Sequence, residues 1–433
     1  MVRHLKSWLA TLTFLLAWIW ICGPASAAER QPLPLSVRRV LYQAQSLIEK
    51  NDLEKARIKL ETFRSKKQRS HYLIEFTLGD IAMRAAAYPR ASAAYHRALK
   101  LNPDFAPAWM NLGKAAYEMA DYLHAADYFQ RAYRTAAAPH PERLYYSAMA
   151  YLMAARPHRG LEMFQALLTQ YPAAVKLEWK PVLVQLYLAL DRPLDALPVI
   201  EELAAQSALP QKAQWQETLI GQYLQLGKVD QALAYTRRLT RTAPLVPRWW
   251  KALAHLLLER RDYEAALEAL VIYTKLTAPG PAEKRLLADL NLQVGIPSVA
   301  ADYYRDLFSK NPDKEILTRL VYTLRLMDRP DEALRYLDAY LSDQAAPDLF
   351  LIKGELLYDM KNYAAAAEAF RRCAQAPSLA GRAWLKAGYA SWQAHNMAAA
   401  IAEFTRASRY PDQKKSALAA LAELKTQSEH PGG

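Results

Sequence analysis

The residues that most often carry catalysis are few in this chain and lie far apart. None of its nine histidines belongs to an H-E-x-x-H pair of zinc ligands, and His124, His158 and His395 fall near expected helix turns, where a solvated imidazole is ordinary. No nucleophile, base and orienting group share a convincing spacing. We therefore expect no enzyme, no metal, no cofactor and no small-molecule substrate.

Two weaker chemical signals have structural explanations. Gly221 to Lys228 resembles a phosphate-binding loop, but five residues instead of four separate its glycines, and Val229 replaces the required Ser or Thr. Cys373 stands three residues after Phe370, at a place that a repeated pattern gives to small core residues. We expect a buried, inert thiol there, with a reactive thiol as the alternative.

The dominant feature is a repeat of about 34 residues. A small residue recurs at eleven places: Ala56, Ala91, Ala125, Gly160, Ala196, Ala232, Ala266, Ala300, Ala333, Ala366 and Ala400. Twelve residues earlier the side chain is often small as well, and four residues later it is large except at Thr236. Two antiparallel helices per unit would touch at the small residues, with the large one beside the contact.

Proline and glycine punctuate the chain where helical hairpins need breaks. The turns between units carry Pro103, Pro172, Pro244, Pro312 and Pro411, and the turns within units carry residues such as Gly227 and Gly295. Units of this kind cannot bury their apolar faces alone, so they must stack into one continuous superhelix.

This pattern resembles the tetratricopeptide repeat family. The residues of unit 106–139 follow the family's order W-x2-L-G and A-x3-F-x2-A: Trp109, Leu112, Gly113, Ala125, Phe129 and Ala132. The resemblance covers residues 37–414 and implies an all-α, alpha-alpha superhelix of about eleven helix-turn-helix repeats. Residues 28–36 are expected to be a short tether, 415–427 a C-terminal capping helix and 428–433 a tail.

The resemblance also implies a protein-binding groove lined by the first helix of each repeat. The aromatic residues that it places there are Tyr117, Tyr145, Tyr146, Tyr322, Tyr358, Tyr389 and Trp392. The alternative is that several of them belong to the core. Some family members grip a terminal carboxylate with Lys and Asn; Asn111 and Lys114 would fit, but Phe76 and Asp80 do not, so we do not expect this mode.

The first 27 residues read as an export signal. Arg3, His4 and Lys6 precede an apolar run from Trp8 to Cys22, and Ala25-Ser26-Ala27 offers a cleavage site. We expect cleavage after Ala27 and a periplasmic protein, with a membrane anchor as one alternative and lipid modification at Cys22 as another.

The formal net charge is +13. No long basic run is present, and export argues against nucleic acid as a partner.

Two stretches suggest a finer assignment. Residues 249–308 and 381–393 look like periplasmic tetratricopeptide proteins that accompany TonB-ExbB-ExbD energy-transducing complexes. This likeness implies a scaffold that mediates protein-protein interactions for such a complex, with TonB, ExbB, ExbD or other cell-envelope proteins as partners. The alternative is a scaffold for polysaccharide synthesis or secretion in the cell envelope.

Overall fold

The computed structural model describes residues 33–66, 70–138, 140–343 and 346–429, and these residues form helices and no strand. The expected export signal, residues 1–27, lies outside the described residues, as do most of the tether and residues 430–433. The chain divides into two compact units: unit 1 ends at Lys228 and unit 2 begins at Val229. Each unit is described by itself.

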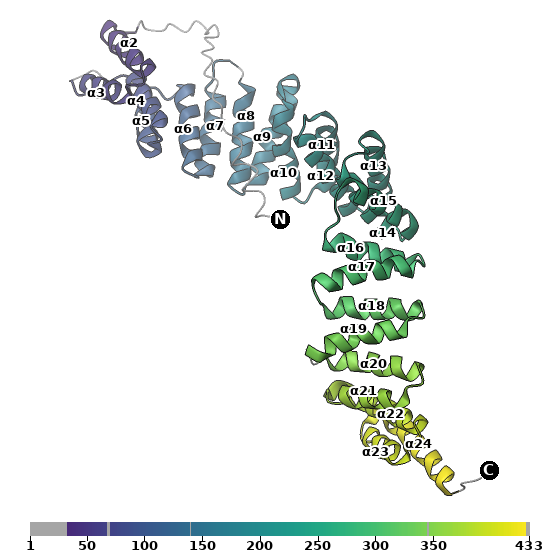
Figure 1. Cartoon of the computed structure of the whole chain (residues 1–433). Coiled ribbons are helices and arrows are strands. Elements are labelled where there is room, and N and C mark those ends of the chain that lie inside the picture. The colour runs from purple at the N-terminus through teal and green to yellow at the C-terminus, as the bar shows by residue number, and fades with distance from the viewer. Residues whose placement is uncertain (1–32, 67–69, 139, 344–345, 430–433) are drawn as a thin grey trace. The chain divides into compact units, whose positions relative to one another are not determined.

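Within unit 1, consecutive helices pack side by side (Figure 1). The α-helices are α2 (Leu35–Glu49), α3 (Leu53–Arg64), α4 (Tyr72–Arg84), α5 (Tyr88–Leu101), α6 (Ala106–Glu118), α7 (Tyr122–Arg134), α8 (Pro141–Met153), α9 (Pro157–Gln170), α10 (Lys180–Ala189), α11 (Pro193–Gln206) and α12 (Gln211–Gln225). Two short 3-10 helices, η1 (Pro172–Ala174) and η2 (Leu177–Trp179), connect α9 to α10.

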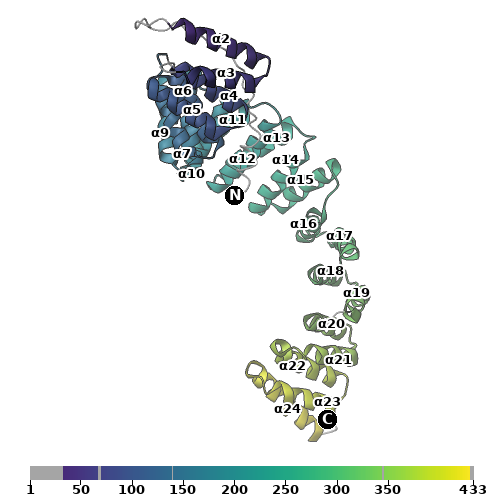
Figure 2. The same cartoon turned by 90° about the vertical axis from the view of Figure 1, so that its left-hand side faces the viewer.

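Unit 2 continues the alternation of first and second helices, and Figure 2 shows the first helices α16, α18 and α20 on one side and the second helices α17, α19 and α21 on the other. They are α13 (Val229–Thr242), α14 (Pro247–Glu259), α15 (Tyr263–Leu276), α16 (Pro281–Gln293), α17 (Pro297–Lys310), α18 (Lys314–Leu326), α19 (Pro330–Asp343), α20 (Pro347–Asp359), α21 (Tyr363–Cys373), α22 (Pro377–Gln393), α23 (Met397–Ala407) and α24 (Pro411–Glu429). The all-α fold built of helix-turn-helix repeats is confirmed.

The recurring small residues lie in the helix contacts, as their spacing predicts. All ten of the alanines have no exposed surface, and Gly160 is buried as well. A Cβ on Gly160 would stand 3.0 Å from the carbonyl oxygen of Ala148 on the neighbouring helix. Side chains larger than alanine would therefore force these helices apart.

The large residue four positions later fills the space beside each contact. Phe129, Phe164 and Phe404, for example, are buried. Thr236, the exception in size, is also buried, and its hydroxyl donates a 2.8 Å hydrogen bond to the carbonyl of Ala232 in its own helix. Most of the core is thus one motif used again in each repeat.

The turn inside each repeat contains one residue with a left-handed backbone. Gly227 and Gly295 fill this place twice, and the other nine residues are Asn51, Ala86, Ala120, Ala155, Asp191, Arg261, Asp328, Lys361 and His395. Several second helices then begin at a side-chain cap; Asp262 and Asn362 each accept a backbone N–H three residues on.

The last helix, α24, is longer than the predicted 415–427 because Pro411 starts it. Proline fits the first turn of a helix, where its missing N–H is not needed. Ala420 and Leu424 pack on Ala400 and Phe404 of the last repeat. This helix therefore packs against the last repeat, while Leu418 on it is half exposed.

Candidate protein-binding groove

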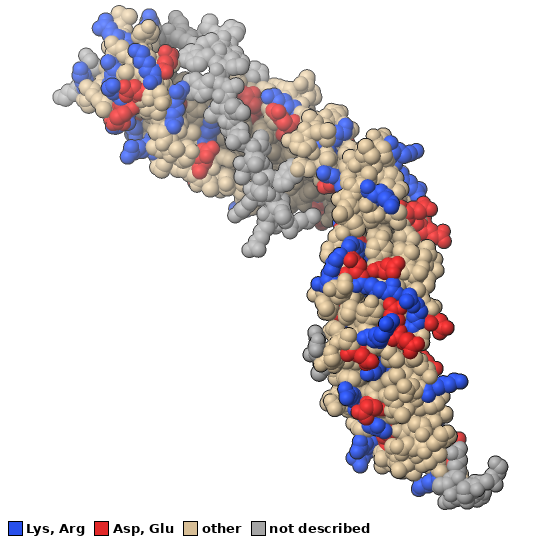
Figure 3. Space-filling view, in the orientation of Figure 1, with Lys and Arg blue, Asp and Glu red and all other residues tan. Residues whose placement is uncertain are grey.

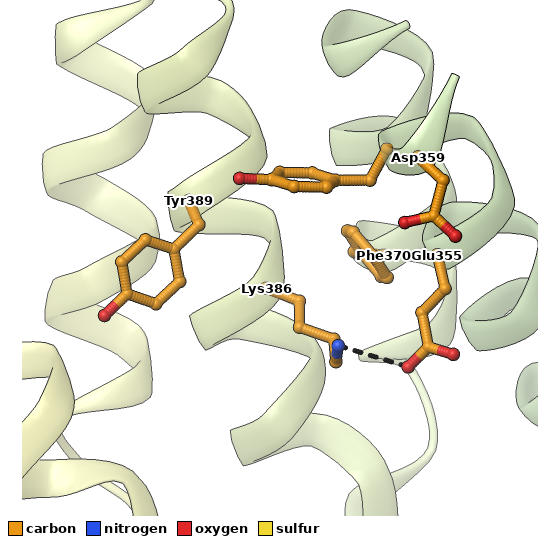
Figure 4. A pocket seen from close by; sticks show the side chains of 6 residues that line it. Glu355, Asp359, Phe370, Lys386 and Tyr389 are labelled. Carbon is orange, nitrogen blue, oxygen red and sulfur yellow. Dashed lines mark ion pairs between the residues drawn. The ribbon is translucent and has the colours of Figure 1, made fainter. Parts of the chain in front are cut away.

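Three successive helices of unit 2 enclose a cavity of about 260 Å³. The residues around it are Glu355, Tyr358 and Asp359 from α20, Phe370 from α21, and Lys386 and Tyr389 from α22. In Figure 4 the ring of Phe370 lies between the two first helices, with Lys386 directed toward Glu355. Two of the predicted groove residues, Tyr358 and Tyr389, therefore meet at one site.

The small residues of the repeat make this cavity possible. A Cβ on Gly354 would stand 2.5 Å from Cε1 of Phe370, so only glycine lets that ring lie against α20. Gly388 plays the same part for Phe404 one repeat later, where a Cβ would stand 2.6 Å from Cδ1 of the ring. The apolar wall of the cavity thus follows from the repeat pattern itself.

Neighbouring cations already satisfy the two acids of the cavity. One oxygen of Glu355 accepts from Nζ of Lys386 at 3.1 Å and from Arg382 at 3.2 Å. Asp359 accepts from Arg325 of α18 at 2.8 Å. Three cations around two carboxylates leave a local excess of positive charge.

The tyrosines add donors to that positive surface. Burial raises the pKa of Tyr358, and the nearby Tyr363 and Tyr389 add to the effect, so its hydroxyl keeps its proton at neutral pH. The ammonium group of Lys386 has three N–H donors. The cavity can therefore offer hydrogen-bond donors to a carboxylate or a carbonyl, beside aromatic rings that suit an apolar group.

An interaction between first helices of successive repeats recurs within each unit. Glu355 and Lys386 are 31 residues apart; Asp289 and Arg319, 30 apart, meet at 3.0 Å. In unit 1, Asp80 accepts a hydrogen bond from Asn111, 31 residues later, at 2.8 Å. Each of these three acids directly follows the small residue of a first helix. Our sequence analysis missed this pairing, although an acid followed by a donor 30 or 31 residues later is a readable signal.

The pairing has a consequence for carboxylate recognition in unit 1. The side-chain amide of Asn111 donates to Asp80, so it is already engaged. Asp80 also accepts from the hydroxyl of Tyr95 at 2.7 Å. A carboxylate brought to Asn111 would meet the carboxylate of Asp80, which agrees with our expectation that unit 1 does not use the terminal-carboxylate mode.

The other predicted groove residues differ in exposure. Tyr322 on α18 is 54% exposed and available for contact. Tyr145 is only 7% exposed and stacks on Trp179 with ring centroids 4.9 Å apart, so its assignment to an open groove is wrong. Tyr117 and Tyr146 are half-buried and pack against the core formed by α8, α9 and α10.

Trp392 is likewise half-buried against the core of the last repeat. Its ring centroid lies 6.3 Å from that of Phe404 and 6.5 Å from that of Tyr389. It therefore supports Tyr389 more than it offers a surface of its own. Substituting both residues together would not separate binding from packing.

The residues that carry the family pattern pack as that pattern implies. Leu112, Ala125, Phe129 and Ala132 are buried, and a Cβ on Gly113 would stand 2.7 Å from the Phe129 ring. Trp109 donates its indole N–H to the carbonyl of Pro103 at 2.7 Å, which ties the helix to the preceding turn.

The groups considered for chemistry have ordinary surroundings. Cys373 is fully buried, and burial raises its pKa to about 11, so the thiolate is scarce at neutral pH. His124 contacts Asp121 at 2.8 Å, and His158 and His395 are exposed near their turns. The described residues contain no cluster of His, Cys, Asp and Glu that could hold a metal, and no helix among them is long and apolar enough to cross a membrane.

Residues 76–141, 222–281 and 351–414 match the sequence pattern of the tetratricopeptide repeat family. These three segments are tetratricopeptide repeats. The cavity between α20 and α22 lies inside the third matched segment. Proteins with tetratricopeptide repeats generally mediate contacts between proteins. No curated protein matches the chain by sequence.

Several solved structures resemble the chain weakly. One is the Naa15/Naa10 complex bound to HypK-THB, at 17% identity over 89% of this chain and 60% of that chain, with a TM-score of 0.41. A tetratricopeptide repeat protein from Parabacteroides merdae has 16% identity over 66% of this chain and 98% of its own, with a TM-score of 0.32.

The C-terminal part of a repeat-containing protein from Cytophaga hutchinsonii has 12% identity over 57% of this chain and 99% of its own, with a TM-score of 0.45. This chain therefore spans 60% of the length of the Naa15/Naa10 chain and nearly all of the two bacterial ones. Likenesses at this level carry no inference about partners.

Proposed function

We propose that this chain is an exported scaffold that binds protein segments and that the cavity between α20 and α22 is one of its binding sites. The observation that carries the proposal is that Tyr358, Phe370 and Tyr389 line one cavity together with Lys386, whose ammonium group lies 5.9 Å from the centroid of the Phe370 ring. Rigid aromatic rings beside a few polar groups are typical of contact residues that dominate protein recognition. The proposed activity is binding, not catalysis.

The chemistry of the cavity favours one kind of partner segment. A side chain with an apolar stem and a terminal carboxylate would place its stem against Phe370 and its oxygens near Lys386. Both acids of the cavity have a cationic partner other than Lys386, since Arg382 pairs with Glu355 and Arg325 pairs with Asp359. An extended segment with an acidic residue beside an apolar one fits best.

A pull-down with matched variants tests the proposal. Residues 28–433 serve as bait in a membrane-solubilised native extract, and recovered proteins are quantified by mass spectrometry. We expect Tyr358→Ala with Tyr389→Ala to lose specific partners, while Tyr42→Ala keeps them, since Tyr42 is 77% exposed on α2, far from the cavity in sequence. Unchanged recovery with the double variant, at unchanged circular dichroism, would contradict the assignment.

The finer proposal concerns the pathway. The likeness of residues 249–308 and 381–393 to periplasmic proteins of TonB-ExbB-ExbD systems supports an accessory role in energised uptake across an outer membrane. Recovery of TonB, ExbB or ExbD would support this role. Recovery of polysaccharide-synthesis proteins would favour the alternative scaffold, and neighbouring genes for glycosyltransferases would point the same way.

Export is the part of the proposal that rests on residues 1–27 alone. Sequencing the N-terminus of the protein isolated from a periplasmic fraction tests it. An N-terminus at Ala28 is the expected result. An intact N-terminus in the membrane fraction would indicate a retained anchor.

A further inference from the structure

The beginning of unit 2 carries a basic surface that the groove does not explain. Residues 231–258 contain Arg237, Arg238, Arg241, Arg248 and Lys251 but no Asp or Glu. The first three are exposed on the last turns of α13, and Arg237 and Arg241 form no ion pair with a described residue. Figure 3 shows Lys and Arg side chains gathered at this end of unit 2.

An apolar residue stands beside these arginines. Leu245, in the turn between α13 and α14, is 79% exposed. The turn is held in place, because the indole N–H of Trp250 donates to the carbonyl of Pro244 at 2.8 Å. Leu245 is therefore presented to solvent by a fixed turn, four residues after Arg241.

Other repeats show that this leucine is not a requirement of the turn. Trp109 makes the same bond to Pro103 at 2.7 Å, yet the next residue there is Asp104. Asp313 follows Pro312, and Asp412 follows Pro411. Among the five inter-unit prolines, Asp follows three and Ala173 follows Pro172, so Pro244 is the one that an exposed leucine follows.

We propose that the surface formed by Arg237, Arg238, Arg241 and Leu245 binds an anionic lipid membrane. Arginine at a membrane surface is attracted to anionic headgroups and donates hydrogen bonds to phosphate oxygens. An exposed leucine beside it enters the boundary between headgroups and acyl chains. A nucleic acid would use the arginines but has no equivalent place for Leu245, so lipid accounts for both features.

Co-sedimentation with lipid vesicles tests the proposal. Residues 28–433 are used, because this form keeps every described helix and lacks the apolar run 8–22, which would insert by itself. Binding is compared between vesicles of phosphatidylcholine and vesicles that also contain phosphatidylglycerol. We expect binding to the anionic vesicles only, weakening as salt is added.

Three variants separate the contributions. Arg237→Gln, Arg238→Gln and Arg241→Gln together should weaken binding by about a hundredfold, at roughly fivefold for each of the three arginines. Leu245→Asp should weaken it by about tenfold. Arg406→Gln with Arg409→Gln is the matched control, because these residues follow Ala400 at the same spacings as Arg238 and Arg241 follow Ala232. Asp412, in the first turn of α24, comes next in place of a leucine, so this variant should bind like the wild type.

Three results would overturn the proposal. One is equal binding to both kinds of vesicle. Another is equal loss in the control variant, since the charge of the whole chain would then be responsible. The third is wild-type binding by Leu245→Asp together with similar affinity for a DNA oligonucleotide, which would indicate a general polyanion surface. Binding to vesicles does not depend on the cavity between α20 and α22, so the two proposals can fail separately.

Discussion

Glycine-to-alanine substitutions at two helix positions of unit 1 should change stability by clearly different amounts. Gly113 on α6 is buried, and a Cβ there would stand 2.7 Å from both Cδ1 and Cε1 of Phe129. Gly221 on α12 is exposed, and a Cβ there would meet no atom within 4 Å. Both substitutions add one methyl carbon. Gly113→Ala places it in space that Phe129 already fills, and Gly221→Ala places it in open space.

The magnitude follows from two opposing effects. Alanine stabilises a helix interior by about 1 kcal/mol relative to glycine, and this gain applies to both sites. A carbon atom forced into a packed core costs about 1–3 kcal/mol, and this cost applies only at Gly113. Subtraction removes the helix effect, so the two variants should differ by about 1–3 kcal/mol, with Gly221→Ala more stable than the wild type.

Urea unfolding followed by circular dichroism measures this difference. Repeat proteins can unfold in stages, so the transition midpoints of the two variants are compared with that of the wild type under identical conditions. If Gly113→Ala were as stable as Gly221→Ala, the ring of Phe129 could move aside freely. The close helix contact deduced for the repeat would then be wrong.

Three further predictions concern single side chains. Burial raises the pKa of the Asp80 carboxyl group to about 6. The folded protein therefore holds the carboxyl proton more tightly than the unfolded chain does. The stability that this proton contributes is lost as the pH rises from about 4 to about 6. Asp80→Asn should raise the thermal midpoint at neutral pH and leave it unchanged near pH 4. In a protein of residues 28–433, which lacks Cys22, the thiol of Cys373 should react with a thiol reagent only after unfolding exposes it. Fast reaction of the native protein would contradict its burial. Ala125→Leu should lower stability by about 1–3 kcal/mol, since Ala125 has no exposed surface, and an unchanged thermal midpoint would refute the repeat register.

The packing of the repeats could be predicted because it depends on side-chain size at fixed intervals. Ala56 and Ala400 lie at opposite ends of the repeat series, and both are fully buried as their spacing requires. Pro411 misled us: a proline between helices can end one or start the next, and only the structure shows that it starts α24.

The groove was less predictable because the same tyrosine can face solvent or the core. Tyr145 and Tyr322 were placed on first helices by the same reasoning, but the ring of Trp179 covers Tyr145. Trp179 lies in the short helix η2, which has no counterpart in the repeat pattern. The cavity itself depends on two neighbouring repeats meeting, and no one segment of sequence signals it.

The left-handed residues of the intra-repeat turns could not be predicted at Ala86, Ala120 or Ala155, since alanine carries no preference for that backbone. A residue with a side chain destabilises the folded state by about 1–2 kcal/mol in this left-handed conformation. Substitution by glycine would remove that strain, but it would cost about 0.5–1 kcal/mol because glycine loses more chain entropy on folding. Each repeat contacts mainly its neighbours, so such changes should add nearly independently. The nine non-glycine turns are therefore separate positions at which glycine could be introduced to raise the stability of the chain in small steps. Lys361 is the one to leave unchanged, because its backbone N–H donates to the carbonyl of Tyr358 in the lining of the cavity.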